Sequence, residues 1–294
     1  MSVLRDGVSA WRALNSIEVS SASMFLGVTC MVGLGTELLA LMRAQDQGFL
    51  VDQGVYMTHI LASSAPTVAA LACVLVLSDS LPSPLAILPE KQSMFDSIVG
   101  AAVAGALGFA ITMLSSFVMC TVYGEAEWMF DAAQAQFIGV FAVISMPLEE
   151  IGYRNYLYLR LKQVFTPTAT SVIIGLLTAL LSVPQYWYLP PFMCETPCQW
   201  QLTYHVLGHV ALSLLAGMVH DSYGGAVVPV IAFRVAHVAA LAGLGLAQIR
   251  SFMLVFSQIG IIAFVVLRLT LFVPPPESPL DARAADADSD AKDD

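Results

Sequence analysis

Apolar runs long enough to cross a bilayer recur along the whole chain, and they constrain its fold more than any other feature. A spanning helix needs about 20 mostly apolar residues. The windows that meet this requirement give about eight candidate spans, at 23–43, 55–78, 97–122, 135–158, 168–189, 202–220, 224–243 and 249–273. Only 12% of the 294 residues are charged, against about 25% in a soluble domain. The sequence therefore predicts an all-α, polytopic membrane protein with about eight transmembrane helices in one bundle.

The chain divides into three parts on composition. Residues 1–22 precede the first span as an N-terminal segment, and residues 23–273 form the transmembrane domain. The segment 274–294 holds a Pro run, alternating Ala and Asp, and seven acidic residues against two basic ones. It offers no apolar face, so we expect an acidic, disordered tail, with partner binding as the alternative. The net charge is −10 without a basic stripe, and no nucleic-acid partner is expected.

The distribution of Lys and Arg predicts the orientation in the membrane. With eight spans both termini share one side, and that side collects Arg5, Arg12, Lys91, Arg160, Lys162, Arg283 and Lys292. The opposite side holds Arg43 and Arg250. We therefore expect cytoplasmic termini in a multi-pass protein of a bacterial inner membrane or an endoplasmic reticulum membrane. The loop with Cys194 and Cys198 would face away from the cytoplasm, where a disulfide is permitted.

Two adjacent carboxylates, Glu149 and Glu150, stand at the polar end of the fourth span. Carboxylates near lipid are unfavourable unless they are paired or hydrated. On a helix Glu150 and Arg154 share a face and can form an ion pair. Glu149 lies about 100° around the helix from Glu150, so this contact leaves it available as a general base on water. The structural alternative is that Pro147 opens a helix whose first turn favours carboxylates.

The order Glu-Glu-x-x-x-Arg, followed by Tyr and Leu residues up to Leu161, resembles the first motif of the CPBP (ABI) membrane proteases. That family includes the type II CAAX prenyl proteases, and the resemblance covers about 137–241 of this chain. It implies an all-helical intramembrane fold that cleaves membrane-associated or prenylated peptides with a Glu-activated water. It also implies that Glu149 is the base and that Glu150 and Arg154 are its supporting pair.

The two later family motifs are altered in this chain. Phe-x-x-x-His corresponds to 181–185, which places Gln185 at the His position. His-x-x-x-Asn corresponds to 234–238, which places Arg234 at the His position and Val238 at the Asn position. Gln185 can donate a hydrogen bond and Arg234 can stabilise negative charge, but neither transfers protons near pH 7 as His does. The resemblance implies either a protease with a modified site or a catalytically impaired relative that acts as a membrane scaffold.

Histidines elsewhere could supply the missing groups. His205 and His209 are four residues apart, a workable two-ligand spacing for a divalent metal, although no Glu stands between them as in a zincin. His237 is one residue short of the Asn position and reaches the site if its helix is rotated. The alternative for each is a buried His satisfied by a neighbour. No other cofactor is expected, and the five cysteines form no metal signature.

Charges inside the membrane also raise a transporter as a third function. Paired inverted repeats would support it, and none is visible in the sequence. Arg234 lies within a span and needs an acidic partner. Glu149 and Glu150 are the nearest candidates on the fold that the resemblance implies.

Overall fold

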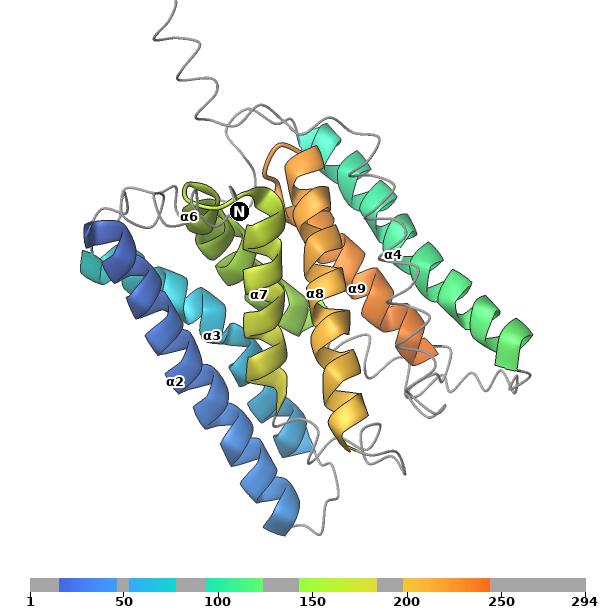
Figure 1. The fold of residues 1–294 in the computed structure, drawn as a ribbon, viewed down its shortest axis with the longest axis horizontal. Coiled ribbons are helices and arrows are strands. Elements are labelled where there is room, and N and C mark those ends of the chain that lie inside the picture. The colour runs from blue at the N-terminus through green and yellow to red at the C-terminus, as the bar shows by residue number, and fades with distance from the viewer. Residues whose placement is uncertain (1–15, 47–52, 78–93, 124–142, 184–197, 244–294) are drawn as a thin grey trace, which may run out of the picture.

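The computed structural model describes residues 16–46, 53–77, 94–123, 143–183 and 198–243. Within these ranges the regular secondary structure is helical throughout, which confirms the all-α prediction. The long helices are α2 (Ser16–Asp46), α3 (Gln53–Leu77), α4 (Met94–Tyr123), α7 (Pro167–Ser182), α8 (Cys198–Ser222) and α9 (Val227–Gly243). Figure 1 shows them packed side by side, with α2 and α3 at one edge and α4 at the other.

The segment that carries the acidic motif lies in the middle of this bundle. It is α-helical from 143 to 152, π-helical in η1 (Tyr153–Tyr158) and α-helical again in α6 (Leu159–Lys162). Every residue of η1 is buried. A π-helical turn inserted into an α-helix is frequent at functional sites, and nothing in the hydropathy of the sequence indicated it.

Two buried apolar clusters flank the motif segment. The first joins η1 to α2, α3 and α7 through residues such as Phe25, Ala69, Tyr156 and Ile174. The second joins α4, α8 and α9 through residues such as Ala104, Ile111, Leu215, Val230 and Phe233. The motif segment is therefore enclosed by protein, and its charged side chains must find partners inside the bundle.

α3 crosses the motif segment at very short range. A Cβ at Gly152 would overlap the backbone of Pro66 and Thr67. The hydroxyl of Thr67 donates a hydrogen bond to the backbone oxygen of Leu148. The missing side chain at Gly152 thus permits a helix crossing that fixes the acidic residues against α3.

Pro147 does not begin a helix in the structure, because residues 143–146 are already helical. The interpretation in which Glu149 and Glu150 occupy a first helical turn is therefore wrong. Their charge is balanced by side chains, and not by the backbone amides that stand unpaired at a helix start. Similarly, α2 begins at Ser16, so the expected segment 1–22 extends into a helix.

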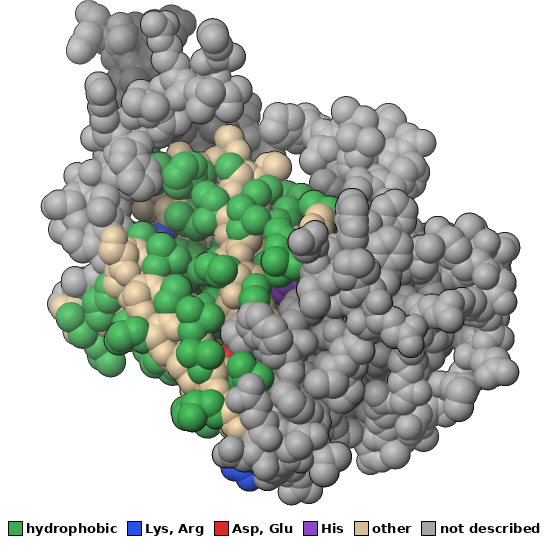
Figure 2. Space-filling view, turned by 60° about the horizontal axis from the view of Figure 1, so that its bottom comes forward, with side chains coloured by type: hydrophobic (Ala, Val, Ile, Leu, Met, Phe, Trp, Pro, Cys, Tyr) green, Lys and Arg blue, Asp and Glu red, His purple; other side chains and the backbone are tan. Residues whose placement is uncertain are grey.

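The apolar surface of the described helices favours a membrane location. Two stretches, Ser21–Arg43 and Phe95–Ser115, are long and apolar enough to cross a bilayer, and they coincide with the expected spans 23–43 and 97–122. Shorter apolar helices cover Ile60–Val76, Pro167–Ser182 and Val227–Ala240. Large apolar side chains such as Met31, Leu75 and Phe95 are more than two-thirds exposed, and Figure 2 shows apolar side chains spread over the visible described surface.

Several expectations fall on residues that the structure does not describe. These are the last expected span at 249–273, the acidic tail at 274–294, and the loop around Cys194. Gln185 also lies outside the described residues.

Candidate active site

Four charged side chains form an alternating series inside the bundle, which we call the charge chain (Arg154, Glu150, Arg234 and Glu149). Arg154 Nε lies 3.2 Å from Glu150 Oε2, which confirms the predicted ion pair. Arg234 Nε lies 3.2 Å from Glu150 Oε1, and Arg234 Nη2 lies 3.5 Å from Glu149 Oε1. The prediction that Arg234 finds its counter-charge in this acidic pair is therefore confirmed.

Arg154 ties the charge chain to α7 and α8. Its Nη2 donates hydrogen bonds to the backbone oxygen of Ser213 at 3.0 Å and to Ser213 Oγ at 2.8 Å. Ser213 Oγ in turn donates to the backbone oxygen of Ser171 at 2.7 Å. The guanidinium also lies over the Tyr158 ring, 5.4 Å from its centroid. Ser213 and Tyr158 thus fix the Arg154 guanidinium, which in turn positions Glu150 through Nε.

The two carboxylates have different surroundings. Glu150 is contacted by two guanidinium groups, and its side chain is 4% exposed. The Glu149 side chain is 12% exposed, and its contact with Arg234 is longer. Glu149 is therefore the less enclosed of the two carboxylates and has one close cation instead of two. Its role as base stays a prediction.

Arg234 is buried in α9 and is held by both acids. Its Nε contact with Glu150 is an ion pair without the alignment of a hydrogen bond. A guanidinium neutralises negative charge but does not give up a proton. At the position where the resembled family has His, this chain consequently supplies a fixed positive charge.

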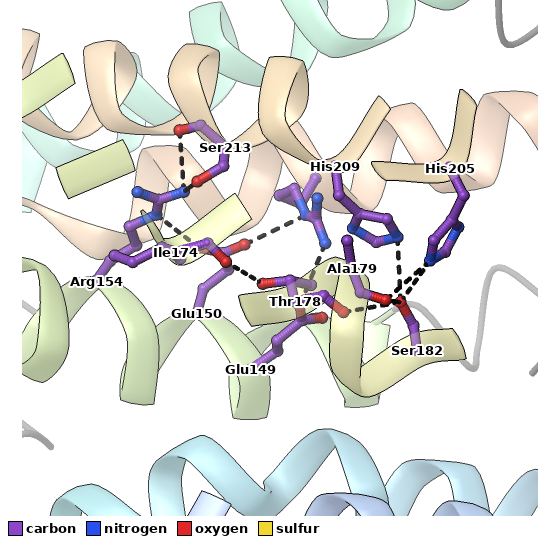
Figure 3. Close-up of polar contacts among 11 residues, drawn as sticks. Glu149, Glu150, Arg154, Ile174, Thr178, Ala179, Ser182, His205, His209 and Ser213 are labelled. Carbon is purple, nitrogen blue, oxygen red and sulfur yellow. Dashed lines mark hydrogen bonds and ion pairs between the residues drawn. The ribbon is translucent and has the colours of Figure 1, made fainter. Parts of the chain in front are cut away.

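His205 and His209 extend from α8 towards α7 and meet at Ser182 (Figure 3). His205 Nε2 lies 2.8 Å from Ser182 Oγ and 3.2 Å from the backbone oxygen of Ala179. His209 Nε2 lies 3.4 Å from Ser182 Oγ, and the two imidazole centroids are 4.3 Å apart. Since a carbonyl oxygen only accepts, His205 carries its proton on Nε2.

These contacts bear on the expected divalent metal. Among the residues that the structure describes, no group of three His, Cys, Asp or Glu side chains converges on one point. Both imidazoles direct Nε2 at the Ser182 hydroxyl. The histidine pair is thus better described as part of a hydrogen-bonded α7–α8 contact.

His237 lies on the side of α9 that faces α4. Its Nδ1 lies 3.0 Å from Thr112 Oγ1, and its ring stacks on Phe233 at a centroid distance of 6.3 Å. These contacts match the alternative stated above, a buried His satisfied by a neighbour. The structure therefore gives His237 a packing role between two helices.

A second polar cluster, which the sequence analysis did not predict, consists of Tyr158, Lys162 and Asp221. Tyr158 donates to Asp221 Oδ2 at 2.7 Å, and Lys162 Nζ donates to Asp221 Oδ1 at 2.8 Å. Burial raises the pKa of Asp221, but hydrogen bonds from His220, Lys162 and Tyr158 outweigh it and lower the pKa to about 2. Only the three-dimensional packing brings Lys162 and Asp221 together, because 59 residues separate them.

Comparison of the sequence with family models and with curated proteins gave no match in either case. The resemblance to the CPBP proteases therefore rests on the motif around Glu149 and Arg154.

Proposed function

We propose that the chain is a multi-pass intramembrane endopeptidase of the CPBP type, which uses a Glu149-activated water to cleave peptide bonds of membrane-associated substrates. The observation that supports this proposal is the buried acidic pair, held by Arg154 and Arg234 within a helical bundle. Such a group of charges is unfavourable in an apolar protein, and intramembrane charges generally mark functional sites. We further propose about eight spans with cytoplasmic termini.

In the proposed reaction Glu149 transfers the proton, and the other members of the charge chain support it. Glu149 takes a proton from water while the water oxygen bonds to the carbonyl carbon of the peptide. The C–N bond then breaks, and the departing nitrogen takes the proton back from Glu149. Glu150 and Arg154 position the helix, since both are already paired within the site. Arg234 balances the negative charge that develops during attack.

A second candidate function has its own supporting observation. Arg234 stands in the family's His position and pairs with both carboxylates, so each acidic side chain of the site has a cationic partner. Fully compensated charges are also what a non-catalytic site would need for stability. The alternative is thus a catalytically impaired relative that binds a membrane partner or a prenylated chain as a scaffold.

Cleavage of a farnesylated fluorogenic peptide by the purified full chain in lipid nanodiscs separates the two functions. If the chain is a peptidase, Glu149→Gln should lower kcat by about 100- to 10,000-fold, because an amide does not accept a proton. Asp96→Asn, which makes the same chemical change at the exposed start of α4, should leave kcat within about threefold of the wild-type value.

The scaffold alternative makes the opposite forecast in the same assay. Wild-type protein and Glu149→Gln would then be equally inert, and both would bind the farnesylated peptide with the same affinity. That result would refute the proposed peptidase.

A further inference from the structure

Neither position at which the later family motifs have His holds an imidazole in this chain. When water attacks a peptide carbonyl, negative charge develops on the carbonyl oxygen and needs an aligned donor. The family motifs would supply imidazoles for this purpose, and in this chain their positions hold Gln185 and Arg234. Arg234 is already engaged by both carboxylates. Arg234 thus supplies positive charge, and an aligned hydrogen-bond donor on another described helix would complete the site.

We infer that His209 of α8 is this second catalytic group and donates a hydrogen bond from Nδ1 to the oxyanion of the tetrahedral intermediate. The inference rests on the proposed function. His209 belongs to a helix that contributes nothing to the resembled motifs, so it departs from the residues that the resemblance implies.

The position of His209 relative to the charge chain supports the inference. His209 lies one helical turn before Ser213, which binds Arg154. Figure 3 shows His209 reaching from α8 towards α7, between the two glutamates and the contact of His205 with Ser182. Of the two imidazoles that meet at Ser182, His209 is thus the one on the side of the acidic pair.

One ring nitrogen of His209 lacks a hydrogen bond within the described part of the chain. Its Nδ1 is buried and has no hydrogen-bond partner among the residues that the structure describes. Its other nitrogen, Nε2, faces the Ser182 hydroxyl. A buried polar nitrogen left without a partner is unfavourable by about 1–3 kcal/mol. This arrangement is expected when a bound ligand supplies the missing partner.

The reaction balances with His209 as a donor that keeps its proton. The water oxygen bonds to the carbonyl carbon, a water proton moves to Glu149, and the carbonyl π electrons move to oxygen, where Nδ1–H donates. The C–N bond then breaks, its electron pair stays on nitrogen, and nitrogen takes the proton from Glu149. His209 and Glu149 both return to their starting states.

His205 provides a matched control one turn earlier on the same face. Its Nε2 proton is already directed at the Ala179 carbonyl and Ser182, so it has a partner without any substrate. A change at His205 therefore tests the α7–α8 packing, while a change at His209 tests the chemistry. Both variants remove one imidazole from the same hydrogen-bonded contact.

The test measures kcat and KM for the farnesylated peptide with wild-type protein, Glu149→Gln, His209→Gln and His205→Gln in nanodiscs. His209→Gln should lower kcat by about 100- to 1,000-fold, the effect of removing an oxyanion donor, with KM unchanged. His205→Gln should change kcat by less than about threefold. A phosphinate analogue of the cleaved bond should bind His209→Gln more weakly by the same factor as kcat/KM falls.

A variant at His209 could also fail to fold, so a rescue experiment accompanies the kinetics. Imidazole added to His209→Ala should restore cleavage, and it should restore none in Glu149→Gln. If wild-type protein is active and His209→Gln keeps its kcat, the inference is refuted while the peptidase stands. Equal losses in His205→Gln and His209→Gln without imidazole rescue would also refute it. If wild-type protein and Glu149→Gln are equally inert, the proposed function fails and the inference fails with it.

Discussion

Replacing Arg154 with Ala should destabilise the bundle more than any change at Glu149 that keeps its shape. Arg154 is 2% exposed and bonds to Glu150 and Ser213. Removing one partner of a buried ion pair costs about 3–5 kcal/mol, because the remaining charge is left poorly compensated. Glu150 keeps Arg234 at 3.2 Å, so we expect the lower end of that range, about 3 kcal/mol.

Two matched variants set the scale for this loss. Glu149→Gln keeps the volume of the side chain and an oxygen that faces Arg234, so we expect about 1 kcal/mol. Lys162→Ala breaks a partly exposed ion pair with Asp221, whose two side chains are 31% and 21% exposed. Exposed pairs contribute about 0–1 kcal/mol. The expected order of destabilisation is therefore Arg154→Ala first, with the other two close together.

Thermal unfolding followed by circular dichroism in one detergent measures this order. At about 2–4 °C per kcal/mol, Arg154→Ala should lower Tm by about 6–12 °C and each of the other variants by less than about 4 °C. Arg154→Lys should fall between, because an ammonium keeps the charge but not the planar fork that reaches Glu150 and Ser213 together. Equal Tm values for Arg154→Ala and Glu149→Gln would refute the reasoning about burial.

Three further predictions concern packing, pH and topology. Gly152→Ala should destabilise the protein by about 1–3 kcal/mol, because the new Cβ meets the backbone of α3. Gly27→Ala is the control, because nothing lies within 4 Å of its new Cβ, and it should be neutral or stabilising. Equal changes in stability for the two variants would contradict this prediction. Asp221 has a folded-state pKa of about 2 against an ordinary value of 3.8, so its stabilising contribution is complete above about pH 4 and is lost as pH falls towards about 2. Asp221→Asn should therefore reduce the loss of stability between about pH 4 and pH 2, measured as Tm against pH. An unchanged pH dependence would count against the lowered pKa of Asp221. A membrane-impermeant thiol reagent should label Cys194 and Cys198 in intact cells after reduction, and labelling only after permeabilisation would reverse the proposed orientation.

Local sequence patterns predicted the part of the site that depends on neighbouring residues. The Glu150–Arg154 pair follows from helical periodicity, and the structure confirms it. The pairing of Arg234 with the acids could also be anticipated, since a guanidinium in an apolar span requires an anion. The apolar windows 23–43 and 97–122 likewise coincide with helices long and apolar enough to cross a bilayer, because hydropathy is a property of single segments.

The remaining contacts depend on how helices cross, which a single sequence does not encode locally. Ser213 reaches Arg154 across 59 positions, and His209 reaches Ser182 across 27. The rotation of α9 decides which of its polar residues faces the acids, and it directs His237 to Thr112 instead. The π-helical turn of η1 also shifts every later residue around the helix axis.

The complete enclosure of residues 150–158 has a consequence for how this segment tolerates change. Every residue from Glu150 to Tyr158 is buried. In a helix with one lipid-facing side, the positions that tolerate substitution recur every three to four residues, and polarity decides which substitutions are tolerated there. A segment enclosed on all sides is limited by packing volume at each position. In saturation mutagenesis of residues 150–158, tolerance to substitution should thus depend on side-chain size and should show no helical periodicity.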